Sequence, residues 1–266
     1  MGAEAFTSVQ HSSLVGSRPY AILLAGDATE YVRKVYGGLA CLFEKMLSDP
    51  GETWHTYHVT DGKFPSDEDI YNYEGFVITG SRHDAHSSEP WVLQLCELIR
   101  KLHKQKMKLL GICFGHQVIS RALGGKTGRS VNGWEVGLRK ISIANALYSK
   151  PYALKVPSSL IIIEIHQDQV SELPPKGELP AASEKTSMEM FAVEDHVLCI
   201  QGHPEFTEDI VLDILDVGLE KHLLPEEVIS QARLSFEEMK ADHWAFQQLC
   251  KSFLKEMPPR RALPKD

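Results

Sequence analysis

The segment Gly111-Ile-Cys113-Phe-Gly115-His-Gln117 constrains this chain more strongly than any other part of it. It follows an apolar run at 108–112 and leads into residues with helical apolar spacing at 118–123. A cysteine between two glycines at a strand-to-helix turn is the pattern of a nucleophile elbow. Such a turn holds the cysteine strained and exposed, and the start of the helix favours the thiolate. The pattern therefore predicts a nucleophile at Cys113 rather than a buried structural cysteine.

The first half of the chain alternates between short apolar runs and stretches with helical spacing. We expect strands at 20–25, 54–59, 75–79 and 108–112, and helices at 36–47 and from Pro90 onward. Continuous apolar strands separated by helices indicate a parallel sheet that is covered on both faces.

The second half of the chain has a different pattern. We expect strands at 137–143, 160–165, 188–193 and 197–201, with a hairpin turn at 194–196, and then helices from 207 to 257. No linker separates the two halves, so we expect one α/β domain over 19–257, a flexible arm at 1–18 and a tail at 258–266. The predicted fold is a three-layer α/β sandwich with a mainly parallel central sheet.

Composition excludes several classes of protein. The chain has 266 residues with 28 basic and 36 acidic side chains, a net charge of −8, which does not favour nucleic-acid or anionic-membrane binding. Five cysteines without a CxxC pair are typical of a reducing compartment. The polar N-terminus has no apolar core of a signal peptide, and no apolar run is long enough to span a bilayer. We therefore expect a cytoplasmic protein.

A thiolate nucleophile needs a base and a group that orients the base. Gly202-His203-Pro204-Glu205 follows a predicted strand, and residues two apart on an extended segment point the same way. His203 and Glu205 are therefore candidates for the base and the orienting carboxylate. His166 and Asp168 have the same spacing and also follow an apolar strand, so position alone leaves both pairs open.

As a set, four motifs resemble the class I glutamine amidotransferase family. They are Gly111-x-Cys113-x-Gly115-x-Gln117, Gly202-His203-Pro204-Glu205, Thr79-Gly80-Ser81 and His166-Gln-Asp168-Gln-Val170. The segment Gly133-Trp134-Glu135-Val136-Gly137, together with the chain length and the helical C-terminus, looks most like the plant γ-glutamyl peptidases of that family. The resemblance implies the family's flavodoxin-like α/β sandwich.

The resemblance also implies roles for individual residues. It makes Cys113 the nucleophile, His203 the base and Glu205 the orienting carboxylate, and it leaves His166 a supporting role. It places the oxyanion hole at the backbone amides of Gly80 and Phe114. Here the Gly80 turn reads Thr-Gly-Ser where many members have Gly-Gly-Pro, so the sequence leaves open whether this loop is preformed.

Further residues are expected to hold the γ-glutamyl group. Gln117 lies one helical turn after the nucleophile, and the family resemblance implies that it contacts the amino-acid end of the substrate. The loop 132–136, with Trp134 and Glu135, is expected to complete this subsite. By charge alone, Glu135 suits the substrate's α-ammonium, and Arg82 or Arg129 suits its carboxylate.

No metal site is expected. His83, Asp84 and His86 lie close together in the sequence, but no cysteine or glutamate follows at a spacing typical of metal ligands.

The resemblance implies a cysteine-dependent γ-glutamyl peptidase that releases glutamate from glutathione conjugates through a γ-glutamyl thioester. It implies a place in sulfur secondary metabolism, such as glucosinolate biosynthesis. This chemistry requires no cofactor, and the expected partner is a small γ-glutamyl substrate, with no nucleic acid, membrane or obligatory protein partner. The alternatives are a glutaminase subunit that supplies ammonia to a separate synthase, and a binding module without activity. The complete set of Cys113, His203 and Glu205 argues against the binding module.

Overall fold

The computed structural model describes residues 18–153 and 156–256. The predicted tail, and the predicted arm apart from Arg18, lie outside the described residues. The strands are β1 Tyr20–Leu24, β2 Trp54–His58, β3 Gly75–Ile78, β4 Lys108–Ile112, β5 Lys126–Arg129, β6 Glu135–Ile143, β7 Ser159–His166, β8 Asp168–Glu172, β9 Gly177–Ala182, β10 Met190–Val193 and β11 Val197–Ile200. The helices are α1 Glu30–Tyr36, α2 Leu39–Leu47, α3 Pro90–Lys104, α4 Phe114–Ala122, α5 Asn145–Tyr148, α6 Glu208–Glu220, α7 Glu226–Glu238 and α8 His243–Lys255, with short 3₁₀ turns at Val59–Asp61, Asp69–Asn72 and Pro151–Ala153.

A nine-stranded sheet forms the centre of the domain, in the order β2-β1-β3-β4-β11-β10-β9-β6-β7. From β2 to β11 every neighbouring pair is parallel. From β11 to β7 every neighbouring pair is antiparallel. The carboxyl ends of β3, β4 and β11 therefore meet at one edge of the sheet, which is where open α/β sheets place their ligands.

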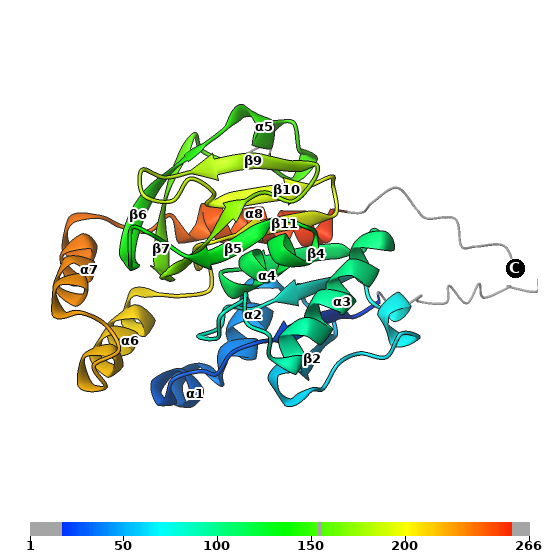
Figure 1. The fold of residues 1–266 in the computed structure, drawn as a ribbon, viewed down its shortest axis with the longest axis horizontal. Helices are drawn as coiled ribbons and strands as arrows, with labels where there is room; N and C mark the ends of the chain where they lie inside the picture. Colours follow the sequence, from blue (N-terminus) through cyan, green and yellow to red (C-terminus); the bar gives the residue numbers. More distant parts are fainter. Residues whose placement is uncertain (1–17, 154–155, 257–266) are drawn as a thin grey trace, which may run out of the picture.

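Helices cover both faces of the sheet, as Figure 1 shows. On one face, α2 and α8 bury an apolar cluster that includes Phe43, Phe246 and Phe253. On the other, α3 and α4 bury a second cluster around Leu95 and Val118. The predicted three-layer α/β sandwich is confirmed. A third cluster packs α6 and α7 onto the outer surface of β6 and β7.

One predicted helix differs from the structure. Residues 36–47 do not form a single helix, because the chain breaks at Gly37 and Gly38, whose φ angles are 83° and 108°. Glycine adopts positive φ without a steric penalty, so α1 ends and α2 starts at this pair. Three further strands, β5, β8 and β9, were not expected, because their sequences carry charged or small residues rather than an apolar run.

In the part of the chain that the structure describes, no helix combines the length and the apolar character needed to cross a bilayer.

Candidate active site

Cys113 lies between β4 and α4 in a strained backbone conformation. Its φ is 52° and its ψ is −103°, a region that a residue with a side chain rarely adopts. Close packing explains the flanking glycine: a Cβ at Gly115 would lie 2.3 Å from the carbonyl oxygen of Ile78. The strand-to-helix turn is therefore the predicted nucleophile elbow in its geometry.

The thiol of Cys113 is less exposed than the elbow pattern predicts. Only 5% of the residue is accessible, while Cys41 on α2 is the exposed cysteine. The Sγ atom faces the carbonyl oxygen of Ile165 on β7 at 3.9 Å. The antiparallel extension of the sheet thus brings β7 over the elbow and closes it, which a local sequence pattern cannot reveal.

His203 connects Cys113 to a buried carboxylate. Its Nδ1 atom lies 2.8 Å from Oε1 of Glu205, and both side chains are buried. The imidazole also forms a hydrogen bond with Cys113. Burial alone would lower the pKa of His203, but the charges of Glu205 and Cys113 and the hydrogen bonds to both raise it to about 10. At neutral pH the arrangement favours the imidazolium form of His203.

An aromatic ring supports the imidazole of His203 from one side. Phe206 stacks on it with ring centroids 4.4 Å apart and an interplanar angle of 7°. The stack restricts rotation of the imidazole and attracts its charged form. Nothing in the sequence singled out Phe206, because its position depends on the turn after Glu205.

His166, the alternative base, has different partners. Its Nδ1 atom lies 3.0 Å from the backbone carbonyl of Asp168 and does not contact that residue's carboxylate. Its Nε2 atom faces Glu164 Oε2 at 3.3 Å and Glu135 Oε2 at 3.7 Å. Burial lowers the pKa of His166 to about 3, so the ring is neutral. Its partners are those of a supporting residue, and the role of His203 as the base stays a prediction.

Behind His166 lies an acidic cluster that the sequence analysis missed. Glu164 and Glu189 are fully buried, and their carboxylates interact electrostatically. Burial, together with the charges of Glu189 and Glu135, raises the pKa of Glu164 well above its usual value. A carbonyl only accepts, so Nδ1 of His166 carries the ring proton and its Nε2 needs a donor. A neutral Glu164 is the donor that this arrangement requires.

The residues expected to supply the oxyanion hole lie beside Cys113. A Cβ placed on Gly80 would be 3.0 Å from Cε1 of His203 and 3.6 Å from Cβ of Cys113. The hydroxyl of Thr79 accepts from the amide of Ala25 and donates to the carbonyl of Gly80, both at 3.0 Å. This side chain fixes the Thr79-Gly80-Ser81 turn. The amide of Phe114 belongs to the first turn of α4, where N–H groups have no partner within the helix.

Gln117 is buried on α4 and already has two partners. Its Nε2 atom donates to the backbone carbonyl of Asp168 at 2.8 Å and to Oε1 of Gln201 at 3.2 Å. The side chain thus ties α4 to the segment that follows His166. Its direct contact with a substrate stays a prediction.

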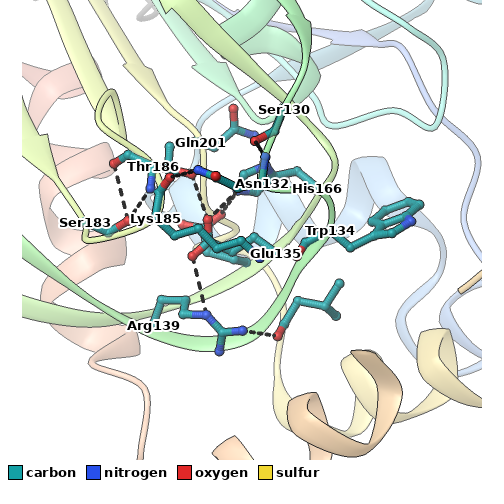
Figure 2. A network of polar contacts seen from close by, with 12 residues as sticks. Ser130, Asn132, Trp134, Glu135, Arg139, His166, Ser183, Lys185, Thr186 and Gln201 are labelled. Carbon is teal, nitrogen blue, oxygen red and sulfur yellow. Dashed lines mark hydrogen bonds and ion pairs between the residues drawn. The ribbon is translucent and has the colours of Figure 1, made fainter. Parts of the chain in front are cut away.

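Glu135 belongs to the polar network of Figure 2. Its Oε2 atom accepts from the hydroxyl of Thr186 at 2.7 Å, and Arg139 lies 3.4 Å from its Oε1 atom. A hollow of about 620 Å³ lies beside it, with Asn132 and Lys185 among its walls. Basic and acidic groups line this hollow together, which suits the zwitterionic end of a γ-glutamyl group, but binding there stays a prediction.

Trp134, the other residue predicted in this loop, is half-buried and lines a separate hollow with the turn between α6 and α7. Its binding role also stays a prediction.

Four charged side chains near the Gly80 loop pair with one another. Arg129 contacts Asp168 at 3.0 Å and Asp84 at 3.2 Å. His86 lies 3.5 Å from Asp168. Asp84, His86 and Asp168 together form a group of side chains that could hold a metal ion. The single positive charge of the Arg129 guanidinium lies against both carboxylates. Arg129 is thus engaged within the protein, while Arg82 is exposed.

Comparison with known proteins identifies the family of this chain. Residues 51–210 match the family model of glutamine amidotransferase class-I. This span contains the elbow and the His203–Glu205 pair. The chain belongs to this family. It is 44% identical to γ-glutamyl peptidase 3 of Arabidopsis thaliana, with 89% of this chain and 96% of the relative covered. γ-Glutamyl peptidase 2 of the same plant is 42% identical, with 90% and 96% covered.

Solved structures of this family share the fold. A glutamine amidotransferase from Methylobacillus flagellatus superposes with a TM-score of 0.70 at 18% identity, with 94% of this chain and 99% of that chain covered. Another from Thermotoga maritima has a TM-score of 0.66 at 18% identity, with 90% and 99% covered. The class I glutamine amidotransferase fold expected from the sequence is therefore confirmed.

Proposed function

We propose that the protein is a γ-glutamyl peptidase that hydrolyses the γ-glutamyl bond of glutathione conjugates and releases glutamate. One observation carries the proposal: a cysteine strained at the end of β4 is hydrogen-bonded to a histidine that a buried glutamate holds. The similarity to plant γ-glutamyl peptidases over nearly the whole chain supports the substrate class.

The first half-reaction forms a thioester. The thiolate of Cys113 attacks the γ-carbonyl carbon of the substrate, and the amides of Gly80 and Phe114 stabilise the oxyanion that develops. The imidazolium of His203 then donates its proton to the leaving amine, which departs as the cysteinyl part of the conjugate. Glu205 stabilises the imidazolium and keeps its Nδ1 proton in place throughout.

The second half-reaction releases glutamate. Neutral His203 now takes a proton from water, which attacks the thioester carbonyl. Collapse of the tetrahedral intermediate expels the Cys113 thiolate and restores the ion pair with His203. Every side chain and backbone amide that acts on the substrate and the water belongs to this chain. The proposed chemistry therefore requires no cofactor and no protein partner.

The proposal extends to the setting of the reaction. The peptidase would act in the cytoplasm, in keeping with five cysteines that are all free. It would follow a reaction that joins glutathione to an electrophile, in sulfur secondary metabolism. Glucosinolate biosynthesis is the pathway that the family resemblance suggests.

The test compares three substrates for release of free glutamate: a glutathione S-conjugate, glutamine and an α-glutamyl dipeptide. We expect the largest kcat/KM for the conjugate, because binding energy from its cysteinyl-glycine part lowers the barrier, and we expect no hydrolysis of the α-linked dipeptide. Glutamine as the fastest substrate, especially with a synthase added, would instead support an ammonia-supplying glutaminase subunit. Cys113→Ser should be inactive, and Cys41→Ser is the matched control.

A further inference from the structure

A hollow of about 420 Å³ lies where the turn between α6 and α7 meets the loop before β6. Trp134, Leu219, Leu223 and Leu224 form its apolar walls, and His222 and Glu226 lie at it as polar groups. Leu219 is 41% exposed and Leu223 is 52% exposed. Solvent-facing apolar side chains that gather around one hollow mark a binding surface more often than scattered ones do.

The hollow is built on tightly packed backbone. A Cβ on Gly218 would lie 2.9 Å from Cδ1 of Leu224, so the missing side chain lets the turn fold back onto α6. Trp134 comes directly before Glu135, the first residue of β6. Both walls are therefore anchored to regular elements, which Figure 1 shows side by side where α6, α7, β6 and β7 meet.

An apolar cluster connects this hollow to the catalytic residues. Trp134, Leu224, Ile165 and Phe206 all pack against the cluster that α6 and α7 form with β6 and β7. The carbonyl of Ile165 faces the Cys113 sulfur, and Phe206 stacks on the imidazole described above. The cluster that borders the hollow thus includes two residues that contact the Cys113 thiol and the His203 ring.

The strand register places the hollow within reach of a substrate. Glu135 pairs with His166, and Val136 pairs with Ile165. Trp134 therefore lies one strand across and two residues along from Ile165, which separates their Cα atoms by about 8 Å. In a γ-glutamyl-cysteinyl substrate the sulfur lies four covalent bonds from the reacting carbonyl carbon, or about 5 Å. A ring or alkyl chain on that sulfur spans the remaining distance.

We propose that this hollow holds the apolar group attached to the sulfur of a γ-glutamyl-cysteinyl conjugate. The inference rests on the proposed function and narrows its substrate class to conjugates with aromatic or alkyl substituents. The volume suits one such group, since pockets for small ligands start at roughly 300 Å³. Contact with Trp134 and the leucines removes apolar surface of the substituent from water.

The experiment measures kcat/KM for glutathione and for S-benzylglutathione. We expect wild type to prefer S-benzylglutathione by at least tenfold. Leu223→Glu, a change at an exposed position, should reduce this preference at least tenfold. Leu234→Glu is the matched control, because Leu234 is 49% exposed on α7 and does not line the hollow. An unchanged preference in Leu223→Glu, or the same loss in Leu234→Glu, would overturn the inference.

A binding measurement separates this inference from the proposed function. Calorimetry on Cys113→Ser should give a lower Kd for S-hexylglutathione than for glutathione. Adding Leu223→Glu to this variant should reduce the ratio of the two Kd values at least tenfold. If this result is obtained while wild type releases no glutamate, the subsite stands and the proposed function fails. If glutamate is released but binding ignores the S-substituent, the function stands and the subsite is wrong.

Discussion

Replacement of Glu205 by glutamine should shift the pH dependence of the reaction by a predictable amount. The carboxylate lies 2.8 Å from His203 in a buried site, and its charge is the largest contribution that raises the pKa of His203 to about 10 against the effect of burial. A hydrogen bond to a charged group contributes about 1.5–3 kcal/mol. A pKa change of one corresponds to about 1.4 kcal/mol. Glu205→Gln should therefore lower the pKa of His203 by about 1 to 2, to between about 8 and 9.

The assay is a profile of kcat/KM against pH, which reports ionisations of the free enzyme. The thiolate–imidazolium pair is lost when His203 deprotonates, so the alkaline limb of the profile should follow its pKa and move to lower pH in Glu205→Gln. At neutral pH the rate loss should be smaller than in His203→Ala, for which we expect roughly 10²–10⁴-fold. The amide of glutamine still accepts from Nδ1, whereas alanine removes the proton carrier.

Two controls make this result specific. Glu208→Gln changes an exposed glutamate at the start of α6 and should leave the alkaline limb in place. Alkylation by iodoacetamide in a Cys41→Ser background reports the reactivity of Cys113 without a substrate and should show the same shift. An alkaline limb that coincides in Glu205→Gln and wild type would refute the coupling between His203 and Glu205.

Three further variants probe the surroundings of the site. Gly80→Ala should keep the fold but reduce kcat about 100-fold, because the new Cβ would lie 3.0 Å from His203 Cε1 and displace the reacting groups. A kcat within twofold of wild type would contradict this. Phe206→Leu should lower the pKa of His203 and reduce kcat/KM by about 2- to 10-fold through loss of the stacked ring, and an unmoved alkaline limb would argue against this role. Glu164 has a folded pKa above its unfolded value, so wild-type stability should fall as pH rises above about 4.5. Urea denaturation between pH 5 and 8 should show a smaller fall for Glu164→Gln, and equal slopes would mean that Glu164 is ionised in the folded state.

Local patterns predicted the geometry around Cys113 and of the His203–Glu205 pair well, because both depend on short and regular spacing. The elbow around Cys113 is encoded by two glycines at close-packed positions, and His203 and Glu205 are brought together by an extended segment. The apolar parallel strands were also predictable, because burial on both faces requires continuous apolar residues.

Features that depend on packing between distant strands were not predicted. The acidic cluster forms only when β6, β7 and the residue before β10 come together. A single glutamate within the apolar run Ile161-Ile-Ile-Glu164-Ile165 was a signal that the sequence offered. The low exposure of Cys113 depends on β7 closing over the elbow. The stack of Phe206 on His203 depends on a turn that no residue pattern marks.

The central claim is that Cys113 carries the γ-glutamyl group during turnover. The most direct measurement is mass spectrometry of protein that has been mixed with a glutathione S-conjugate and quenched in acid within the first turnover. The account predicts a mass increase of one glutamyl residue on the peptide that contains Cys113, and no such increase in Cys113→Ser. Glutamate release at the wild-type rate by Cys113→Ser, or an adduct confined to another residue, would contradict it.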